Sequence, residues 1–135
     1  MLCIKIELDY IIIMNSAKFI IISGPAASYS KVNAEENRTL YNCPEAYKWD
    51  KHVAKVTNYI IDKDEPCAII TQSNIVVNQF LIRLKNNKLN VEDMEIYFCD
   101  ENNEVQKLEV KQHGRIRKAP DGFMQQYMED LTALL

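Results

Sequence analysis

The chain has 135 residues, of which 47% are hydrophobic, and a formal net charge of −3. This length suits one domain, residues 1–135, with a core of ordinary size. The negative balance provides no general attraction to nucleic acid or to an anionic membrane, so neither is expected as a partner of the chain by itself. No apolar run approaches the ~18 residues that a membrane span needs.

The four cysteines, Cys3, Cys43, Cys67 and Cys99, lie far apart in the sequence and form no Cys-x-x-Cys pair. Neither histidine stands at a ligand spacing from them, so the sequence predicts no metal site. We therefore expect reduced thiols in a cytoplasmic protein.

The first 13 residues contain an alternation of apolar and charged side chains. Lys5, Glu7 and Asp9 interrupt the apolar run from Leu2 to Ile13 at every second position, which is the period of a strand. Met14 is a second plausible start. Two interpretations stay open: residues 1–13 form an extra edge strand, or they belong to an over-extended reading frame.

Residues 19–22, Phe-Ile-Ile-Ile, are a continuous apolar run typical of a strand that is covered on both faces. Gly24-Pro25 ends it, residues 26–38 are expected to form a loop, and residues 39–41 a brief strand. A helix is predicted to open at Pro44, since proline suits the first helical position and Glu45 would sit in the first turn. The apolar stripe of this helix is Ala46, Trp49, Val53, Val56 and Ile60.

A second buried strand is expected over residues 67–71, followed by a helix that Ser73 can cap. A third strand spans residues 93–99, and an antiparallel hairpin turns at His113-Gly114. A last helix is predicted to begin near Gly122. This order predicts an α/β fold: a mainly parallel sheet flanked by helices, with a C-terminal antiparallel hairpin and helix.

The segment from Gly24 to Lys31, Gly-Pro-Ala-Ala-Ser-Tyr-Ser-Lys, follows a strand as a phosphate-binding loop does. Such a loop needs Gly-x4-Gly-Lys-Ser/Thr, whose second glycine lets the backbone wrap the phosphates. Here Tyr29 stands at the second glycine, Ser30 at the lysine, and Lys31 comes one residue late. We therefore predict an ordinary surface loop and no phosphate loop.

Thr71-Gln72-Ser73 stands at the carboxyl end of a predicted parallel strand, which is where α/β sheets place ligands. Three polar residues at that place also make a simple helix cap. Two other polar clusters, the acidic residues at 62–65 and the basic residues of 107–118, are predicted to be a solvated turn and a solvated hairpin.

The order of motifs over residues 67–135 resembles the C-terminal end of the ABC-type AAA ATPases, relatives of the RecF, SMC and OLD-type heads of bacterial and phage conflict systems. The matching segments are Cys-Ala-Ile-Ile-Thr-Gln-Ser, Val-Glu-Asp-Met-Glu-Ile-Tyr-Phe and Gly-Arg-Ile-Arg-Lys-Ala-Pro-Asp-Gly-Phe. The resemblance continues upstream to Leu40-Tyr-Asn-Cys-Pro-Glu-Ala46, which is similar to the family's Walker B strand end. It therefore covers residues 39–135 and implies a truncated half of a P-loop ATPase head.

The resemblance also implies which chemical groups have been replaced. Asn42 stands at the magnesium-linked acidic position, Cys43 at the following catalytic position, and Gln72 at the switch histidine, which Ser73 follows. Glu45 matches the glutamate after the proline. An amide is no general base, and a neutral ligand holds Mg²⁺ poorly.

Two functions follow as expectations. The first is a non-catalytic pseudo-ATPase without a cofactor, which binds or modulates an intact ABC-type ATPase in a phage or mobile-element setting; a homodimer is also compatible with the sequence. The alternative is a chain that contributes Glu45, Gln72 and Ser73 to a composite ATP-Mg²⁺ site completed by a separate P-loop chain. A third interpretation, a decaying remnant of a broken gene, is disfavoured by the coherent apolar faces of the helices.

Overall fold

A computed structural model describes residues 3–7, 10–14, 17–25, 31–33, 38–42, 49–102, 104–120, 122–123 and 133–134. Its centre is a five-stranded sheet in the order β5-β6-β3-β7-β8. The first four of these strands run parallel to one another, and β8 runs antiparallel to β7. The expected α/β class with a mainly parallel sheet is therefore confirmed.

The middle strand, β3 (Phe19–Ser23), lies between β6 (Cys67–Ile70) and β7 (Met94–Cys99). Ile21 pairs with Ile69 on one side and with Ile96 on the other, and all three are fully buried. The continuous apolar runs at these places are explained by this position, because a strand with neighbours on both edges and cover on both faces has no solvent side. The edges are β5 (Thr39–Asn42) and β8 (Val105–Lys107).

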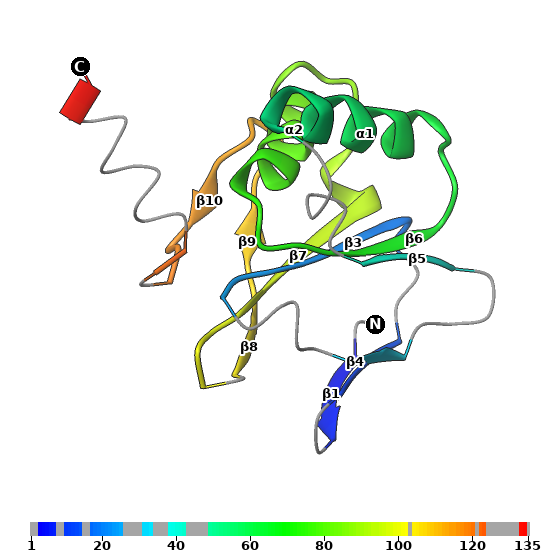
Figure 1. The fold of residues 1–135 in the computed structure, drawn as a ribbon, viewed down its shortest axis with the longest axis vertical. Helices are drawn as coiled ribbons and strands as arrows, with labels where there is room; N and C mark the ends of the chain where they lie inside the picture. Colours follow the sequence, from blue (N-terminus) through cyan, green and yellow to red (C-terminus); the bar gives the residue numbers. More distant parts are fainter. Residues whose placement is uncertain are drawn as a thin grey trace.

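Two helices, α1 (Asp50–Asp62) and α2 (Asn74–Lys85), pack side by side on one face of this sheet (Figure 1). They form the connections from β5 to β6 and from β6 to β7. Both connections advance in the same direction across the sheet, and right-handed crossovers therefore bring both helices to the same face. The core below them is built around Phe19 and Phe80, whose rings meet edge to face at a centroid distance of 5.7 Å.

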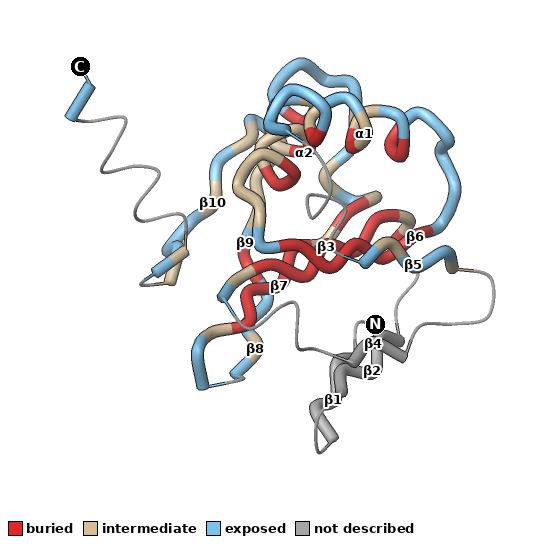
Figure 2. Tube along the Cα trace, viewed as in Figure 1, coloured by how far each residue is buried: buried red, intermediate tan, exposed pale blue. Residues whose placement is uncertain are grey.

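A second, smaller cluster covers the opposite face of the sheet and includes Ile20, Ile22, Ile70 and Tyr97. These residues are also almost fully buried, as Figure 2 shows for the strands that carry them. The connection from β3 to β5 runs in the opposite direction across the sheet, and a right-handed path puts it on this second face. Part of that connection is β4 (Lys31–Asn33), which lies on the side away from the helices in Figure 1.

The predicted single strand over residues 2–13 is wrong. The structure has two strands there, β1 (Cys3–Glu7) and β2 (Tyr10–Met14), which pair antiparallel, and β4 joins β2 in parallel. The alternation at positions 5, 7 and 9 is equally compatible with a hairpin. A two-residue period is the same in one long strand and in two short strands joined by a turn. These strands form a separate three-stranded sheet instead of an edge of the main one. The expected loop over residues 26–38 correspondingly contains β4.

The predicted helix start at Pro44 falls on residues 43–48, outside the described part of the chain. Trp49 itself is extended, with φ −76° and ψ 160°, and α1 begins after it at Asp50. Placing Trp49 on the apolar stripe was therefore wrong: its side chain is 83% exposed, whereas Val53 and Ile60 are buried as expected. Asp50 supplies the anion of the first turn that Glu45 was expected to supply.

The C-terminal part contains the expected hairpin. A 3₁₀ turn (η3, Val91–Asp93) precedes β7, and β9 (Glu109–Val110) pairs antiparallel with β10 (Ile116–Arg117) around His113-Gly114. Gln112 anchors this hairpin to α2, because its side-chain amide donates to the carbonyl oxygens of Leu84 and Leu89. The predicted last helix falls mostly outside the described residues, and no helix in the described ranges has the length and apolar character to cross a bilayer.

Candidate functional site

The three sequence segments singled out for chemistry end at one edge of the main sheet. Asn42 is the last residue of β5, Gly24-Pro25 follows β3, and Thr71-Gln72-Ser73 follows β6. The register places Asn42 and Ile22 on either side of the same residue, Ile70. The carboxyl ends of adjacent parallel strands are the usual ligand edge of an α/β sheet, so this is the candidate site.

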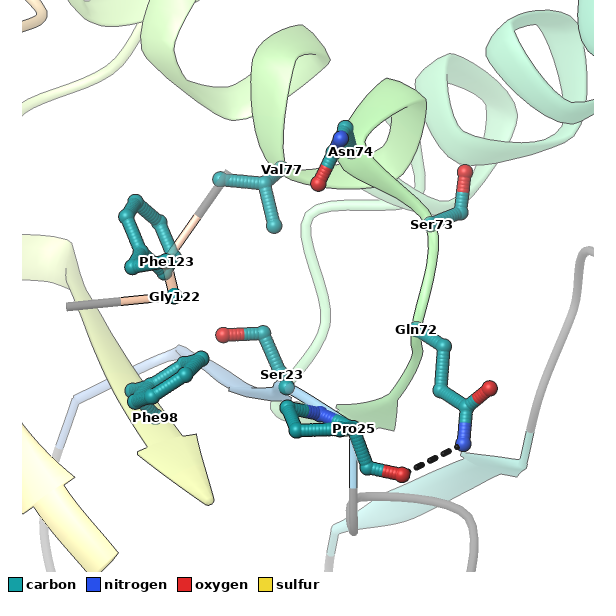
Figure 3. A pocket seen from close by; sticks show the side chains of 10 residues that line it. Ser23, Pro25, Gln72, Ser73, Asn74, Val77, Phe98, Gly122 and Phe123 are labelled. Atoms are coloured by element: carbon teal, nitrogen blue, oxygen red, sulfur yellow. Dashed lines mark hydrogen bonds between the residues drawn. The ribbon is translucent and has the colours of Figure 1, made fainter. Parts of the chain in front are cut away.

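Gln72 bridges the gap between the loops after β6 and β3. Its side-chain Nε2 donates a 2.9 Å hydrogen bond to the carbonyl oxygen of Pro25 (Figure 3). Gln72 and the start of the segment that follows β3 therefore contact each other directly.

Thr71 and Ser73 have local structural roles. The Thr71 hydroxyl oxygen accepts from the Ser73 backbone N–H at 3.0 Å, and Ser73 Oγ accepts from the Ile75 N–H at 3.2 Å. The expected cap at Ser73 is thus confirmed. These two bonds satisfy amides that a helix start otherwise leaves open to an anion.

Gly24 can only be glycine. Its φ is +109°, and a Cβ built on it would lie 2.3 Å from the carbonyl oxygen of Cys99 at the end of β7. The chain leaving β3 therefore packs backbone to backbone against β7. The rest of the phosphate-loop-like segment, residues 26–30, lies outside the described residues, and Lys31 begins β4 in the other sheet.

A pocket of about 250 Å³ opens between these loops and the start of α2 (Figure 3). Gly24, Pro25, Gln72 and Ser73 form one side of this strand-end pocket. Its remaining walls are Ser23, Asn74, Val77, Phe98, Gly122 and Phe123. The sequence did not single out this second group; the only signal for Gly122-Phe123 was their place in the Pro-x-Gly-Phe tail.

No charged side chain lines the strand-end pocket among the residues that the structure describes. Across those ranges, no group of three or more His, Cys, Asp or Glu side chains is arranged to hold a metal ion. The walls therefore offer hydroxyl, amide and aromatic groups, which can hydrogen-bond and stack but cannot neutralise a phosphate. Cys43 and Glu45 lie outside the described residues, so their relation to this pocket stays a prediction.

The acidic and basic clusters noted in the sequence form ion pairs on the surface, away from the strand-end pocket. Lys111 lies 2.8 Å from Glu109 and, as hydrogen-bond partner, holds the pKa of that carboxyl below its usual value. Asp62 is paired with Arg83 and Asp64 with Lys18, each at 2.7 Å. Exposed pairs of this kind stabilise little.

The two thiols whose side chains are described, Cys67 and Cys99, are both buried. Burial raises the pKa of Cys67 to about 11, an effect that the nearby Arg38 charge only partly offsets. A thiol of this kind is unreactive at neutral pH, which agrees with the expectation of reduced cysteines.

Comparisons of the chain with protein-family models, with curated proteins and with solved structures found no match.

Proposed function

We propose that this chain is a non-catalytic module with a truncated ABC-type ATPase-head fold, and that it acts by binding an intact ATPase of that type. The phage or mobile-element setting implied by the resemblance is part of this proposal. The observation that carries it is the hydrogen bond between Gln72 and Pro25. In an ATPase of this kind the switch residue senses the terminal phosphate, whereas here Gln72, at the matching position, bonds to the loop that follows the neighbouring strand β3.

The chemistry of the site supports a role without hydrolysis. Phosphoryl transfer depends on cations and a metal ion that neutralise the developing charge. At the matching positions the chain has Asn42 and Gln72, and the strand-end pocket has neutral walls. These groups can maintain the shape of the edge without supplying the charges that the reaction needs.

An exposed aromatic surface supports binding to a protein. Trp49 and Tyr59 are 83% and 64% exposed. Trp49 precedes α1, and its ring meets that of His52 edge to face at a centroid distance of 6.0 Å; Tyr59 follows His52 by seven residues, on the same face of the helix. Lys63 connects this face to the edge strand, since its Nζ lies 5.1 Å from the Tyr59 ring centroid and the nearby Tyr41 of β5 raises its pKa. Exposed Trp and Tyr are the residue types that interfaces favour.

Affinity capture with matched variants tests this proposal. The wild-type chain is expected to capture a P-loop ATPase that mass spectrometry identifies, and the double variant Trp49→Ala/Tyr59→Ala should lose it. Ile82→Ala is the control, because Ile82 is also a large exposed apolar residue (49%) but lies on the other helix. Recovery of no ATPase by the wild-type chain would contradict the proposal.

The second candidate is the composite site, which Ser23 and Asn74 favour because both line the pocket beside Gln72. A partner chain that carries a P-loop would then complete the site. Under this candidate, Gln72→Ala changes the turnover of the partner while its affinity for this chain is unchanged. Under the first candidate, the same variant leaves both quantities unchanged.

A further inference from the structure

The strand-end pocket lies where the sheet changes the direction of its connections. The chain leaves β6 towards α2 on the helical face, and it leaves the neighbouring β3 towards β4 on the opposite face (Figure 1). In open α/β sheets, ligands bind in the crevice that such diverging connections create at the carboxyl ends of the strands. This location makes the pocket a ligand site on topological grounds that are independent of the ATPase resemblance.

One side of the pocket is apolar and aromatic. Phe98 from β7 and Phe123 meet edge to face with a centroid distance of 5.6 Å and an interplanar angle of 90°, and Val77 of α2 continues this wall. Phe98 is almost fully buried, at 4% exposed, whereas Phe123 is half-buried, so Phe123 offers most of the ring surface to the space beside them. A flat ligand can stack on such a wall.

The other side is polar and uncharged. Ser23 is 4% exposed, points into the pocket in Figure 3, and donates its hydroxyl to the Tyr97 carbonyl, so the oxygen lone pairs remain as acceptors. Asn74 faces it from the first turn of α2 and offers both a donor and an acceptor. A ligand edge that carries both donors and acceptors therefore finds partners here.

An anion is disfavoured in this pocket, although α2 begins at its rim. Ser73 Oγ already accepts the Ile75 amide, and Thr71 Oγ1 accepts the Ser73 amide. No cation lines the walls among the described residues. The volume of about 250 Å³ is below the range of about 300–1,000 Å³ for drug-sized ligands, so the occupant is small.

We propose that the strand-end pocket binds a small, uncharged, planar heterocycle of nucleobase size, stacked on the Phe98–Phe123 wall and hydrogen-bonded by Ser23 and Asn74. The heterocycle displaces water from the aromatic wall. Its polar edge forms hydrogen bonds with the Ser23 hydroxyl and with the side-chain amide of Asn74. Recognition depends on shape and hydrogen bonding, so a phosphate adds nothing to the affinity.

Calorimetric titration of the full chain with adenosine, guanosine, cytidine, uridine and inorganic phosphate tests the proposal. At least one nucleoside is expected to bind with a dissociation constant at or below about 1 mM, and phosphate is not. Asn74→Leu should weaken that binding about tenfold. Asn78→Leu, the same change one turn later on α2 and outside the pocket lining, should leave it unchanged.

If Asn74→Leu fails to fold, a second variant, Ser23→Ala, provides the same test. Its affinity for the nucleoside should also fall. The proposal is overturned if no nucleoside binds with a dissociation constant at or below about 1 mM, if phosphate binds more tightly than the nucleosides, or if Asn78→Leu and Asn74→Leu weaken binding equally. Its failure can be distinguished from failure of the ATPase-partner proposal, because partner capture is measured without nucleoside and depends on Trp49 and Tyr59.

Discussion

The side-chain amide of Gln72 lies 2.9 Å from the carbonyl oxygen of Pro25 and closes the gap between the loops that follow β6 and β3. The two residues are 47 positions apart in the chain but belong to adjacent parallel strands. The bond is exposed to solvent, so its contribution to stability is modest and its main effect is to fix the mouth of the strand-end pocket.

Replacing Gln72 with Glu removes this bond at neutral pH, because a carboxylate cannot donate to a carbonyl oxygen. We expect the free energy of unfolding in urea to fall by about 0.5–1 kcal/mol. Gln106→Glu, which adds the same charge on the exposed strand β8, is the matched control and should change stability less. Equal losses in the two variants would show that the charge alone, and not the hydrogen bond, is responsible.

The close approach of Gly24 to β7 predicts a strong effect of one methyl group. Gly24→Ala must accommodate a Cβ that would lie 2.3 Å from Cys99 O, at a φ of +109°. We expect a loss of at least about 2 kcal/mol in the free energy of unfolding.

Gly122→Ala is the matched control for this prediction. Gly122 also has a positive φ, +85°, but the nearest atom to its Cβ would be Phe98 Cζ at 3.9 Å. Its loss should therefore be limited to backbone strain, about 1 kcal/mol. A Gly24→Ala loss no larger than that of Gly122→Ala would contradict the packing of the β3 loop on β7.

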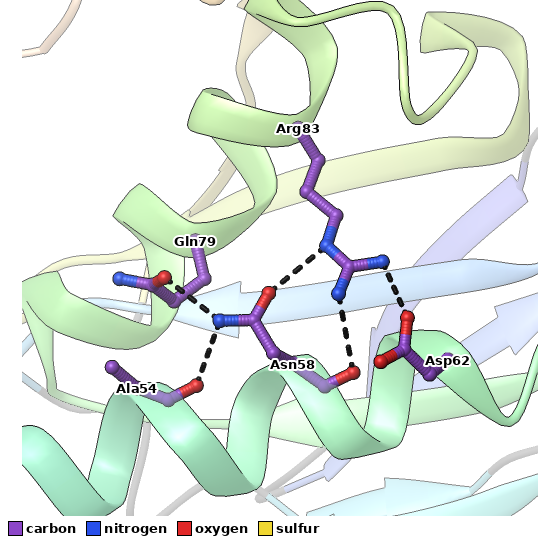
Figure 4. A network of polar contacts seen from close by, with 5 residues as sticks. All are labelled: Ala54, Asn58, Asp62, Gln79 and Arg83. Carbon is purple, nitrogen blue, oxygen red and sulfur yellow. Dashed lines mark hydrogen bonds and ion pairs between the residues drawn. The ribbon is translucent and has the colours of Figure 1, made fainter.

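Asn58 joins the two helices through a network of side chains (Figure 4). Its Nδ2 donates to Gln79 Oε1 at 2.9 Å, and its Oδ1 accepts from Arg83 Nε at 2.9 Å. Asn58→Ala leaves both partners of α2 unsatisfied in a partly buried place, so we expect a loss of about 1–2 kcal/mol in urea unfolding.

Asp62→Asn tests the exposed end of the same network. Its hydrogen bond with Arg83 holds the pKa of the Asp62 carboxyl below its usual value. The stabilisation from this pair is therefore present above the usual pKa of an aspartate and is lost as the pH falls through the lowered one. Because the carboxylate is 65% exposed, Asp62→Asn should lower the free energy of unfolding by less than Asn58→Ala does. A larger loss for Asp62→Asn would contradict the central role of Asn58.

The buried thiol of Cys67 predicts a pH dependence of stability. Its pKa is raised by burial from 9.0 to about 11 in the folded chain, so the folded state holds this proton over an interval in which the unfolded state releases it. The stabilisation is complete below pH 9 and is lost as the pH rises towards 11, by about 2–3 kcal/mol. Cys67→Ala removes this pH dependence. The difference in the free energy of unfolding between the wild-type chain and the variant should therefore decrease as the pH rises from 9 to 11. A difference that is constant with pH would contradict the raised pKa.

Much of the main sheet was predictable because its strands are apolar on both faces. The sequence shows three long apolar runs, at residues 19–22, 67–70 and 94–99. Ser73 is a residue type that caps helices, so it also indicates the start of α2. Their relative order in the sheet was not predictable. The position of β3 between β6 and β7 follows from right-handed connections and from which faces remain to be covered, which no local pattern encodes.

The candidate site was predictable only in part. The segments at Asn42 and Gln72 could be placed at strand ends, but the contact of Gln72 with Pro25 depends on the neighbouring positions of β6 and β3. The aromatic wall joins Phe98 and Phe123 from segments 25 residues apart, and nothing in the spacing marks them as partners. Trp49 was misplaced because a helical spacing continues through it, although its backbone is extended.

The proposed function requires that this edge of the sheet keeps the shape of an ATPase head without its chemistry. The most direct measurement is calorimetric titration of the purified chain with ATP, with and without Mg²⁺, up to millimolar concentration. We predict no magnesium-dependent binding, and any heat from ATP should equal that from adenosine, because only the base would be recognised. Tight binding of ATP that requires Mg²⁺ would contradict the claim, since it would mean that the loop after β3 or Asn42 still holds the phosphates and their metal ion.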